Sequence, residues 1–100
     1  MASKPETLFK KKVIDALLKI PRVAVFVIQQ MSKRGDPDLL VCFNGAFIAL
    51  ELKKDTKSKA SPLQKHILGK VTQAGGYARV CSPENLETIL AEIKESYDYT

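Results

Sequence analysis

The sequence has few of the residues that form metal clusters and disulfide frameworks, and it has no long hydrophobic run. Of its 100 residues one is histidine, His66, so histidines cannot supply a cluster of metal ligands. Cys42 and Cys81 lie in apolar, strand-like runs, where a free cysteine behaves as a small buried hydrophobic residue. No apolar run approaches the ~20 residues of a membrane span, and the N-terminus leads into a lysine-rich helical pattern. We therefore expect a cytoplasmic protein of a reducing compartment, without a signal peptide or a membrane partner.

The composition is that of a soluble globular protein. Hydrophobic residues make up 45% of the chain and charged residues 27%, which argues against disorder. A chain of this length can bury a modest core, so we expect a single domain over residues 1–100. The net charge of +5 and the isoelectric point near 9.3 favour a polyanionic partner, most commonly nucleic acid. A merely soluble basic surface explains the charge equally well.

Hydrophobic spacing and turn residues predict seven secondary-structure elements. The predicted helices span about residues 3–19, 61–75 and 83–95, and the predicted strands span residues 23–29, 38–43, 46–53 and 77–81. The two middle strands are apolar on both faces, which is typical of central strands covered by helices above and below. We therefore predict an α/β fold of element order αβββαβα, with a central mixed sheet flanked by helices.

Residues 35–53 predict a hairpin that carries acids at its open end. Asn44-Gly45 lies between two apolar runs, which is the strongest short-range signal for a two-residue type I′ turn. In such a hairpin the numbers of opposed residues add up to a constant, here 89, so Asp38 faces Glu51. Lys53 follows Glu51 by two residues and points to the same face.

Two opposed carboxylates need positive charge nearby. Their Cβ atoms are expected roughly 5 Å apart, and like charges at this distance destabilise a strand pair. Lys53 supplies one positive charge. A divalent cation is the natural further neutraliser, because Mg²⁺ binds one or two carboxylates together with phosphate and water.

Two of the predicted helices each carry one polar residue on an otherwise apolar face. Ser3 and Glu6 have the spacing of a capping box, yet Glu6 also projects along the apolar stripe and could reach the hairpin acids. Ser61 and Gln64 have the same spacing, with proline at the first helical position between them. For Glu6 and Gln64 we keep two interpretations, a helix cap and a residue of the hairpin site. For Gln64 the two do not exclude each other.

Basic residues flank the predicted acids on both sides. Residues 30–35 form a polar, basic loop before Asp38, and residues 54–60 form a mobile basic loop after the second hairpin strand. Exposed lysines in loops are usually only solvated, but their proximity to the acids favours contact with a nucleic-acid backbone. The candidates for this contact are Lys33, Arg34, Lys54, Lys57, Lys59 and Lys65.

Pro37-Asp38 followed by Glu51-Leu52-Lys53, within the predicted element order, resembles the PD-(D/E)XK nuclease superfamily. The stretch from Gly35 to Leu39 and the later Ser61-Pro62-Leu63-Gln64 look most like the VRR-NUC group, which is also similar to Holliday junction resolvases. The resemblance covers most of the chain. It implies a single restriction-endonuclease-like domain.

By this resemblance the chain is a metal-dependent DNA endonuclease. The ligands of Mg²⁺ or Mn²⁺ would be Asp38, Glu51 and the backbone carbonyl of Leu52. Lys53 would be the catalytic lysine, Gln64 the conserved-type helical glutamine and Glu6 the helix-borne acid. Short stand-alone relatives of phage and bacterial origin form homodimers that cut branched DNA. We therefore expect a homodimer that acts on branched DNA and uses no small-molecule cofactor.

Two other functions stay open. One is a nuclease of the same fold that acts on unbranched duplex DNA or on DNA ends, and the other is a non-catalytic nucleic-acid-binding module whose acids are structural. A histidine-based nuclease is disfavoured, because it needs a histidine as general base and often further histidines for its metal. A tyrosine-nucleophile enzyme is disfavoured because the three arginines, Arg22, Arg34 and Arg79, are few and scattered.

Overall fold

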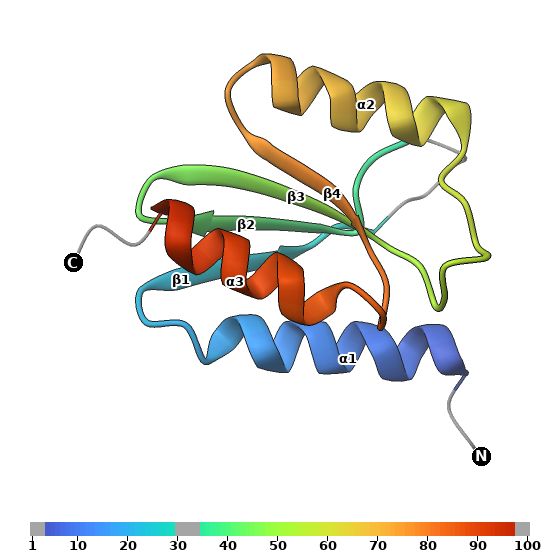
Figure 1. The fold of residues 1–100 in the computed structure, drawn as a ribbon, viewed down its shortest axis with the longest axis horizontal. Helices are drawn as coiled ribbons and strands as arrows, with labels where there is room; N and C mark the ends of the chain where they lie inside the picture. The colour runs from blue at the N-terminus through green and yellow to red at the C-terminus, as the bar shows by residue number, and fades with distance from the viewer. Residues whose placement is uncertain (1–3, 30–34, 98–100) are drawn as a thin grey trace.

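The computed structural model describes residues 4–29 and 35–97, and these form four strands and three helices in the predicted order. The elements are α1 (Pro5–Leu18), β1 (Val23–Val27), β2 (Leu39–Phe43), β3 (Ala46–Leu52), α2 (Pro62–Gln73), β4 (Tyr77–Cys81) and α3 (Leu86–Tyr97). The strands lie in the order β1-β2-β3-β4 (Figure 1). β1, β2 and β3 pair antiparallel, and β4 pairs parallel to β3. The predicted mixed sheet with order αβββαβα is therefore confirmed.

The main core lies between the sheet and the pair α1 and α3. Its buried members come from both helices and from all strands except β1; they are Phe9, Val13, Leu17, Ile20, Leu39, Val41, Phe43, Ile48, Leu50, Cys81, Leu86, Ile89, Leu90 and Ile93. α2 packs on β3 and β4 from the opposite face of the sheet (Figure 1). None of the three helices in the described ranges is long and apolar enough to cross a bilayer.

The second face of the sheet is covered only in part, which corrects the expectation of full cover on both faces. α2 is a single helix of 12 residues over β3 and β4. The face of β1 and β2 beside it has no helix of the described chain on it, so Phe26 stays 58% exposed. Phe47, near the start of β3, is 50% exposed, and its pairing partner Cys42 on β2 is also exposed. Of the two cysteines expected in the interior, only Cys81 is buried.

The β2–β3 hairpin has the predicted turn and register. Asn44 and Gly45 have positive φ angles of 52° and 82°, as a type I′ turn requires. Leu39 pairs with Leu50, and this pair has the predicted sum of 89. β2 begins at Leu39, one residue later than expected and two residues after Pro37, which cannot donate to the ladder. The carbonyl of Asp38 still accepts a hydrogen bond from the backbone of Ile28, at 3.0 Å.

One predicted helix cap is correct and one is wrong. At the start of α2 the Ser61 hydroxyl accepts from the Gln64 N–H, and the Gln64 side chain accepts from the Ser61 N–H. α1 instead begins at Pro5 with Lys4 as its N-cap and no side-chain cap. Proline at the first helical position sets this start, so Glu6 falls one residue short of the capping-box position. Ser3, the expected cap, lies outside the described residues.

Candidate active site

The open end of the hairpin brings together the residues expected there. The Asp38 carboxylate accepts a hydrogen bond from the backbone N–H of Leu52, with its Oδ2 at 2.7 Å. The Lys53 ammonium lies 3.4 Å from Glu51 Oε2. Asp38 thus reaches across from the start of β2 to the end of β3, where Glu51 also lies. The turn at the far end of the hairpin sets this alignment, because it fixes which residues of the two strands are opposed.

Glu51 is a buried carboxylate with incomplete hydrogen bonding. Only 3% of its surface is exposed, and its Oε1 has no hydrogen-bond partner among the described residues. Burial and the neighbouring Asp38 raise the pKa of Glu51 to about 7, although Lys53 opposes the rise. A buried polar atom without a partner is costly, and such atoms often mark the place of an absent ion or water. The free oxygen of Glu51 is therefore the clearest sign of a ligand site.

Gln64 caps α2 and also bonds two residues at the open end of the hairpin. Its Oε1 accepts from the Ser61 N–H at 2.8 Å and from the Lys53 ammonium at 3.3 Å. Its Nε2 donates to Glu51 Oε2 at 2.8 Å. The cap bond fixes which end of the amide faces which partner, so the same side chain orients both Lys53 and Glu51. Both interpretations of Gln64 from the sequence agree with this geometry.

Gly35 allows the chain before the acids to pack against the start of α2. A Cβ atom at this position would lie 2.7 Å from Leu63 Cγ, and 2.8 Å and 2.9 Å from the backbone oxygen and carbon of Leu63. No side chain fits there without moving the backbone of α2. Gly35 therefore supplies space for this close approach. The approach brings the segment leading to Asp38 against the helix that carries Gln64.

The first turns of α1 form a second wall of the site. Glu6, Thr7 and Lys10 line a cavity of about 240 Å³ together with Asp38 and Leu52. Glu6 is exposed, so it does not point into the core, and its carboxylate lies 3.5 Å from the Lys54 ammonium. A backbone N–H and Lys54 hold the pKa of Glu6 below its ordinary value. The geometry agrees with Glu6 as a residue at the edge of the site and not as a cap.

Lys10 is the charged residue of this wall that the sequence analysis did not single out. It follows Glu6 by four residues, which places both on one side of a helix. That spacing was the available signal. The spacing alone does not show that this side of α1 lies against the open end of the hairpin, which is a feature of the tertiary structure.

The basic residues expected to contact a nucleic acid lie in different parts of the structure. Lys33 and Arg34 lie outside the described residues. Lys59 and Lys65 line a cavity of about 400 Å³ that also includes Ser58 and Ser82. Lys54 pairs with Glu6, and Lys57 is exposed and lines neither cavity.

The loop from Lys54 to Ala60, expected to be mobile, has internal hydrogen bonds. Asp55 Oδ1 accepts from the backbone N–H groups of Lys57 and Ser58, at 2.9 and 2.8 Å, and from the Ser58 hydroxyl. These bonds hold the pKa of Asp55 below its ordinary value. The lysines of this loop are therefore presented on a turn with a defined shape.

The acids suit a hard cation such as Mg²⁺. Within the described ranges no three or more histidine, cysteine or acidic side chains converge, so the protein offers two close carboxylates and not a full cage. Mg²⁺ is usually held by one or two carboxylates and completes its shell with water and phosphate. The unpartnered Oε1 of Glu51 beside Asp38 fits that requirement.

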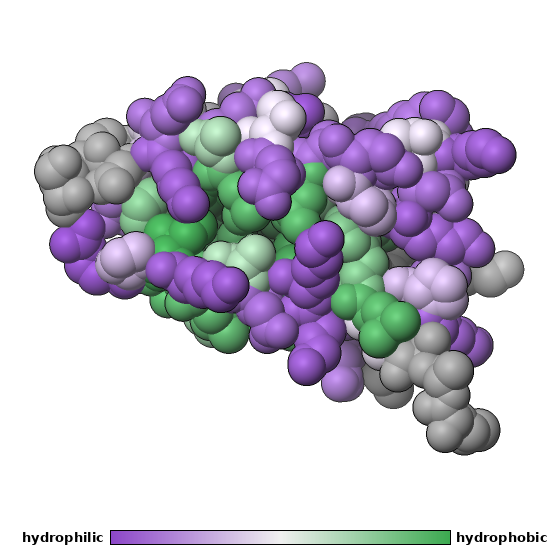
Figure 2. Space-filling view, turned by 60° about the horizontal axis from the view of Figure 1, so that its bottom comes forward, coloured by the Kyte–Doolittle hydropathy of each residue, from purple (hydrophilic) through white to green (hydrophobic). Residues whose placement is uncertain are grey.

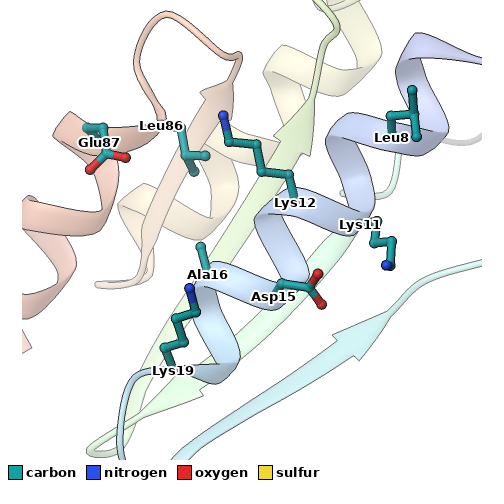
Figure 3. A pocket seen from close by; sticks show the side chains of 8 residues that line it. All are labelled: Leu8, Lys11, Lys12, Asp15, Ala16, Lys19, Leu86 and Glu87. Carbon is teal, nitrogen blue, oxygen red and sulfur yellow. The ribbon is translucent and has the colours of Figure 1, made fainter.

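A further hollow lies away from these acids. It is about 430 Å³ in volume and separates α1 from the start of α3, where Leu86 and Glu87 face Lys12 and Ala16 (Figure 3). Figure 2 views the molecule from the α1 side, and hydrophobic residues gather in the middle of this face between hydrophilic side chains. None of the hairpin acids lines this hollow.

Comparison with known proteins identifies the fold. No family model and no curated protein sequence matches the chain. A solved structure described as a VRR_NUC domain superposes with a TM-score of 0.76 at 22% identity, covering 89% of this chain and 97% of that one. Another, described as a VRR_NUC domain protein, has a TM-score of 0.74 at 18% identity, covering 94% and 91%. Matches at such identities establish the fold alone, which this chain shares with the structures described as VRR_NUC domains, and this is the fold that the sequence motifs predicted.

Proposed function

Because the chain has the VRR-NUC fold and gathers two carboxylates and a lysine at one end of its hairpin, we propose that it is a metal-dependent DNA endonuclease. The reaction is the hydrolysis of phosphodiester bonds. The observation that carries the proposal is the buried, unpartnered oxygen of Glu51 next to Asp38. A non-catalytic binding module has no need for two adjacent carboxylates, one of them buried without a full set of partners.

Asp38 and Glu51 would hold the ion through their carboxylates, together with the backbone carbonyl of Leu52. The chemistry that Mg²⁺ or Mn²⁺ would supply there is that of a Lewis acid, which polarises a phosphate and lowers the pKa of water. The N–H of Leu52 keeps Asp38 Oδ2 in place, so the orientation of this carboxylate does not depend on the ion. Gln64 does the same for Glu51 Oε2 and leaves Oε1 free.

Lys53 is the cation that meets the reacting phosphate. Its side chain is 20% exposed, so the ammonium touches both the buried acids and the solvent. One of its three N–H groups is donated to Gln64 at 3.3 Å, and a second can serve the ion pair with Glu51, whose Oε2 lies 3.4 Å away. The third can orient the attacking water or stabilise charge that develops on the phosphate oxygens. Fixed charges of this kind contribute most where water is excluded.

We further propose a homodimer that acts on branched DNA. Two sites related by a two-fold axis can cut two strands symmetrically. The partly uncovered sheet face, with Phe26 and Phe47 exposed, supports a contact with a second copy. A light-scattering mass of twice 11.1 kDa is the expected result, and a mass of 11.1 kDa would refute the dimer.

Cleavage assays test the enzyme. Purified protein with Mg²⁺ is incubated with a four-way junction and with a linear duplex, and EDTA should abolish cleavage. Asp38→Asn and Lys53→Met should each lower the rate by about 100-fold or more. Asp15→Asn and Lys11→Met, which remove the same charges from the exposed side of α1, should not. Tight binding without cleavage of either substrate would favour the non-catalytic module, and equal cleavage of both would favour action on unbranched DNA.

A further inference from the structure

Two cavities with lysines in their walls lie beside the acid pair. The α1 cavity is lined by Glu6, Thr7, Lys10, Asp38 and Leu52. The loop cavity is lined by Asp55, Thr56, Ser58, Lys59, Ala60, Lys65, Val80, Ser82 and Asn85. We propose that a DNA strand crosses the open end of the hairpin with one backbone phosphate in each cavity, held by Lys10 in the first and by Lys59 and Lys65 in the second. This inference rests on the proposed function and names the path of its substrate.

The α1 cavity needs a cation if an anionic strand is to approach it. Asp38 and Glu6 both line it, and like charges would repel a phosphate there. Lys10 is the one lysine among its lining residues, and it makes no ion pair with a described residue. Lys54 is already paired with Glu6. Lys10 is therefore the available contact for a phosphate on this side of the acids.

The loop cavity is positive although one acid lines it. Asp55 uses its Oδ1 to hold the turn through three hydrogen bonds, so that oxygen is directed into the loop. The Asn85 side chain already makes two hydrogen bonds, since it accepts from the Ser82 N–H and donates to the Val80 carbonyl. Lys59 and Lys65 make no ion pair within the described part of the chain. Two ammonium groups without an ion pair, Lys59 on the preformed loop and Lys65 near the start of α2, suit a phosphate.

The two cavities follow one another along the rim of the sheet. The α1 cavity adjoins the start of β2 and the end of β3, through Asp38 and Leu52. The loop cavity adjoins the end of β4, through Val80 and Ser82. β3 and β4 are parallel neighbours, so their ends lie side by side. The start of α1, the loop after β3 and the start of α2 lie at this same end of the molecule (Figure 1). A DNA strand that joins the two cavities therefore passes Asp38 and Glu51.

The salt dependence of DNA binding tests this path without any need for cleavage. A linear duplex is titrated with protein in EDTA at salt concentrations from about 50 to about 200 mM, where the removal of one phosphate contact lowers the slope of log affinity against log salt by about 0.9. Lys10→Met, and the double variant Lys59→Met with Lys65→Met, should each lower the slope by about that amount. The drop in affinity across this range would then be about 3.5-fold smaller for each phosphate contact removed.

Controls of equal charge separate the cavities from a diffuse basic surface. Lys11→Met is the match for Lys10→Met on α1, and the double variant Lys70→Met with Lys94→Met is the match for the loop cavity. All four control and test proteins should keep the wild-type circular dichroism spectrum, and the controls should keep the wild-type slope. Control slopes that fall as far as the test slopes would overturn the proposed path.

Failure of the path and failure of the proposed function give different results. Wild-type protein that cuts DNA in Mg²⁺, with unchanged slopes in both test variants, would overturn the path and leave the nuclease intact. Wild-type protein that binds DNA without cutting it, with slopes lowered as expected, would refute the nuclease and support the path. Wild-type protein that binds no DNA would overturn both.

Discussion

Replacing Glu51 by glutamine should stabilise the metal-free protein at neutral pH. Burial and Asp38 raise the pKa of this carboxyl from 4.5 to about 7 in the folded protein. Between these values the unfolded chain releases its proton while the folded protein keeps it, so the free energy of unfolding falls as the pH rises from 4.5 to about 7. Below pH 4.5 the carboxyl group is protonated in both states, so it does not lower the free energy of unfolding. Glutamine has no proton to lose, and its amide oxygen can still accept from Gln64.

The expected size of the effect follows from the same two values. A rise from 4.5 to about 7 corresponds to at most about 3 kcal/mol, and to less wherever water reaches the carboxylate. The measurement is urea unfolding in EDTA, followed by circular dichroism, at several pH values across the interval. The stability of the wild type should fall relative to Glu51→Gln as the pH rises and then level off. Glu84→Gln, at an exposed position, is the control and should follow the wild type.

Mg²⁺ should remove the difference in stability between the wild type and Glu51→Gln, because an ion bound to the folded state compensates the buried charge of Glu51. It should stabilise the wild type at neutral pH and have little effect on Glu51→Gln. If wild type and variant lose stability in parallel over the whole pH range, the carboxylate is not desolvated and the reasoning is wrong. If Mg²⁺ stabilises both proteins equally, the ion binds elsewhere.

Substitutions at three other positions test further parts of the structure. Gln64→Glu keeps a side chain that can cap α2 but sets a second carboxylate against Glu51, so single-turnover cleavage should fall at least about 10-fold. Gln64→Ala should also cost about 1 kcal/mol of stability, because it removes the side-chain half of the capping box while the Ser61 hydroxyl still caps the helix. Gly35→Ala should destabilise the fold by about 1–3 kcal/mol in urea unfolding, because the new methyl group meets the backbone of Leu63; an unchanged stability would show that α2 can move away. Ile93→Ala should cost about 2–5 kcal/mol in the same assay, since its side chain is fully buried between α3 and the sheet, and a smaller loss would mean that the core collapses around the gap.

The predictions that succeeded depend on neighbours in the sequence. Asn44-Gly45 determines a turn, the turn determines the register, and the register determines that Asp38 and Glu51 end on the same part of the rim. Ser61 and Gln64 form their capping box for the same reason, since the two residues lie three positions apart at the start of one helix. The expected α1 cap failed because proline at the first position moved the helix start by one residue, a local effect that a spacing rule overlooks.

The tertiary structure alone decided what lies around the acids. Whether Glu6 and Lys10 meet Asp38 depends on the angle at which α1 crosses the hairpin, and that angle is set by packing of Phe9, Val13 and their partners in the core. The exposure of Cys42 and Phe47 depends on how far one short helix extends over the sheet. The role of Gly35 depends on a contact with Leu63, 28 residues later in the chain. The sequence by itself thus determined the acid pair and its lysine, because one hairpin carries them, whereas the walls of the site come from elements distant in sequence that only the packed core brings together.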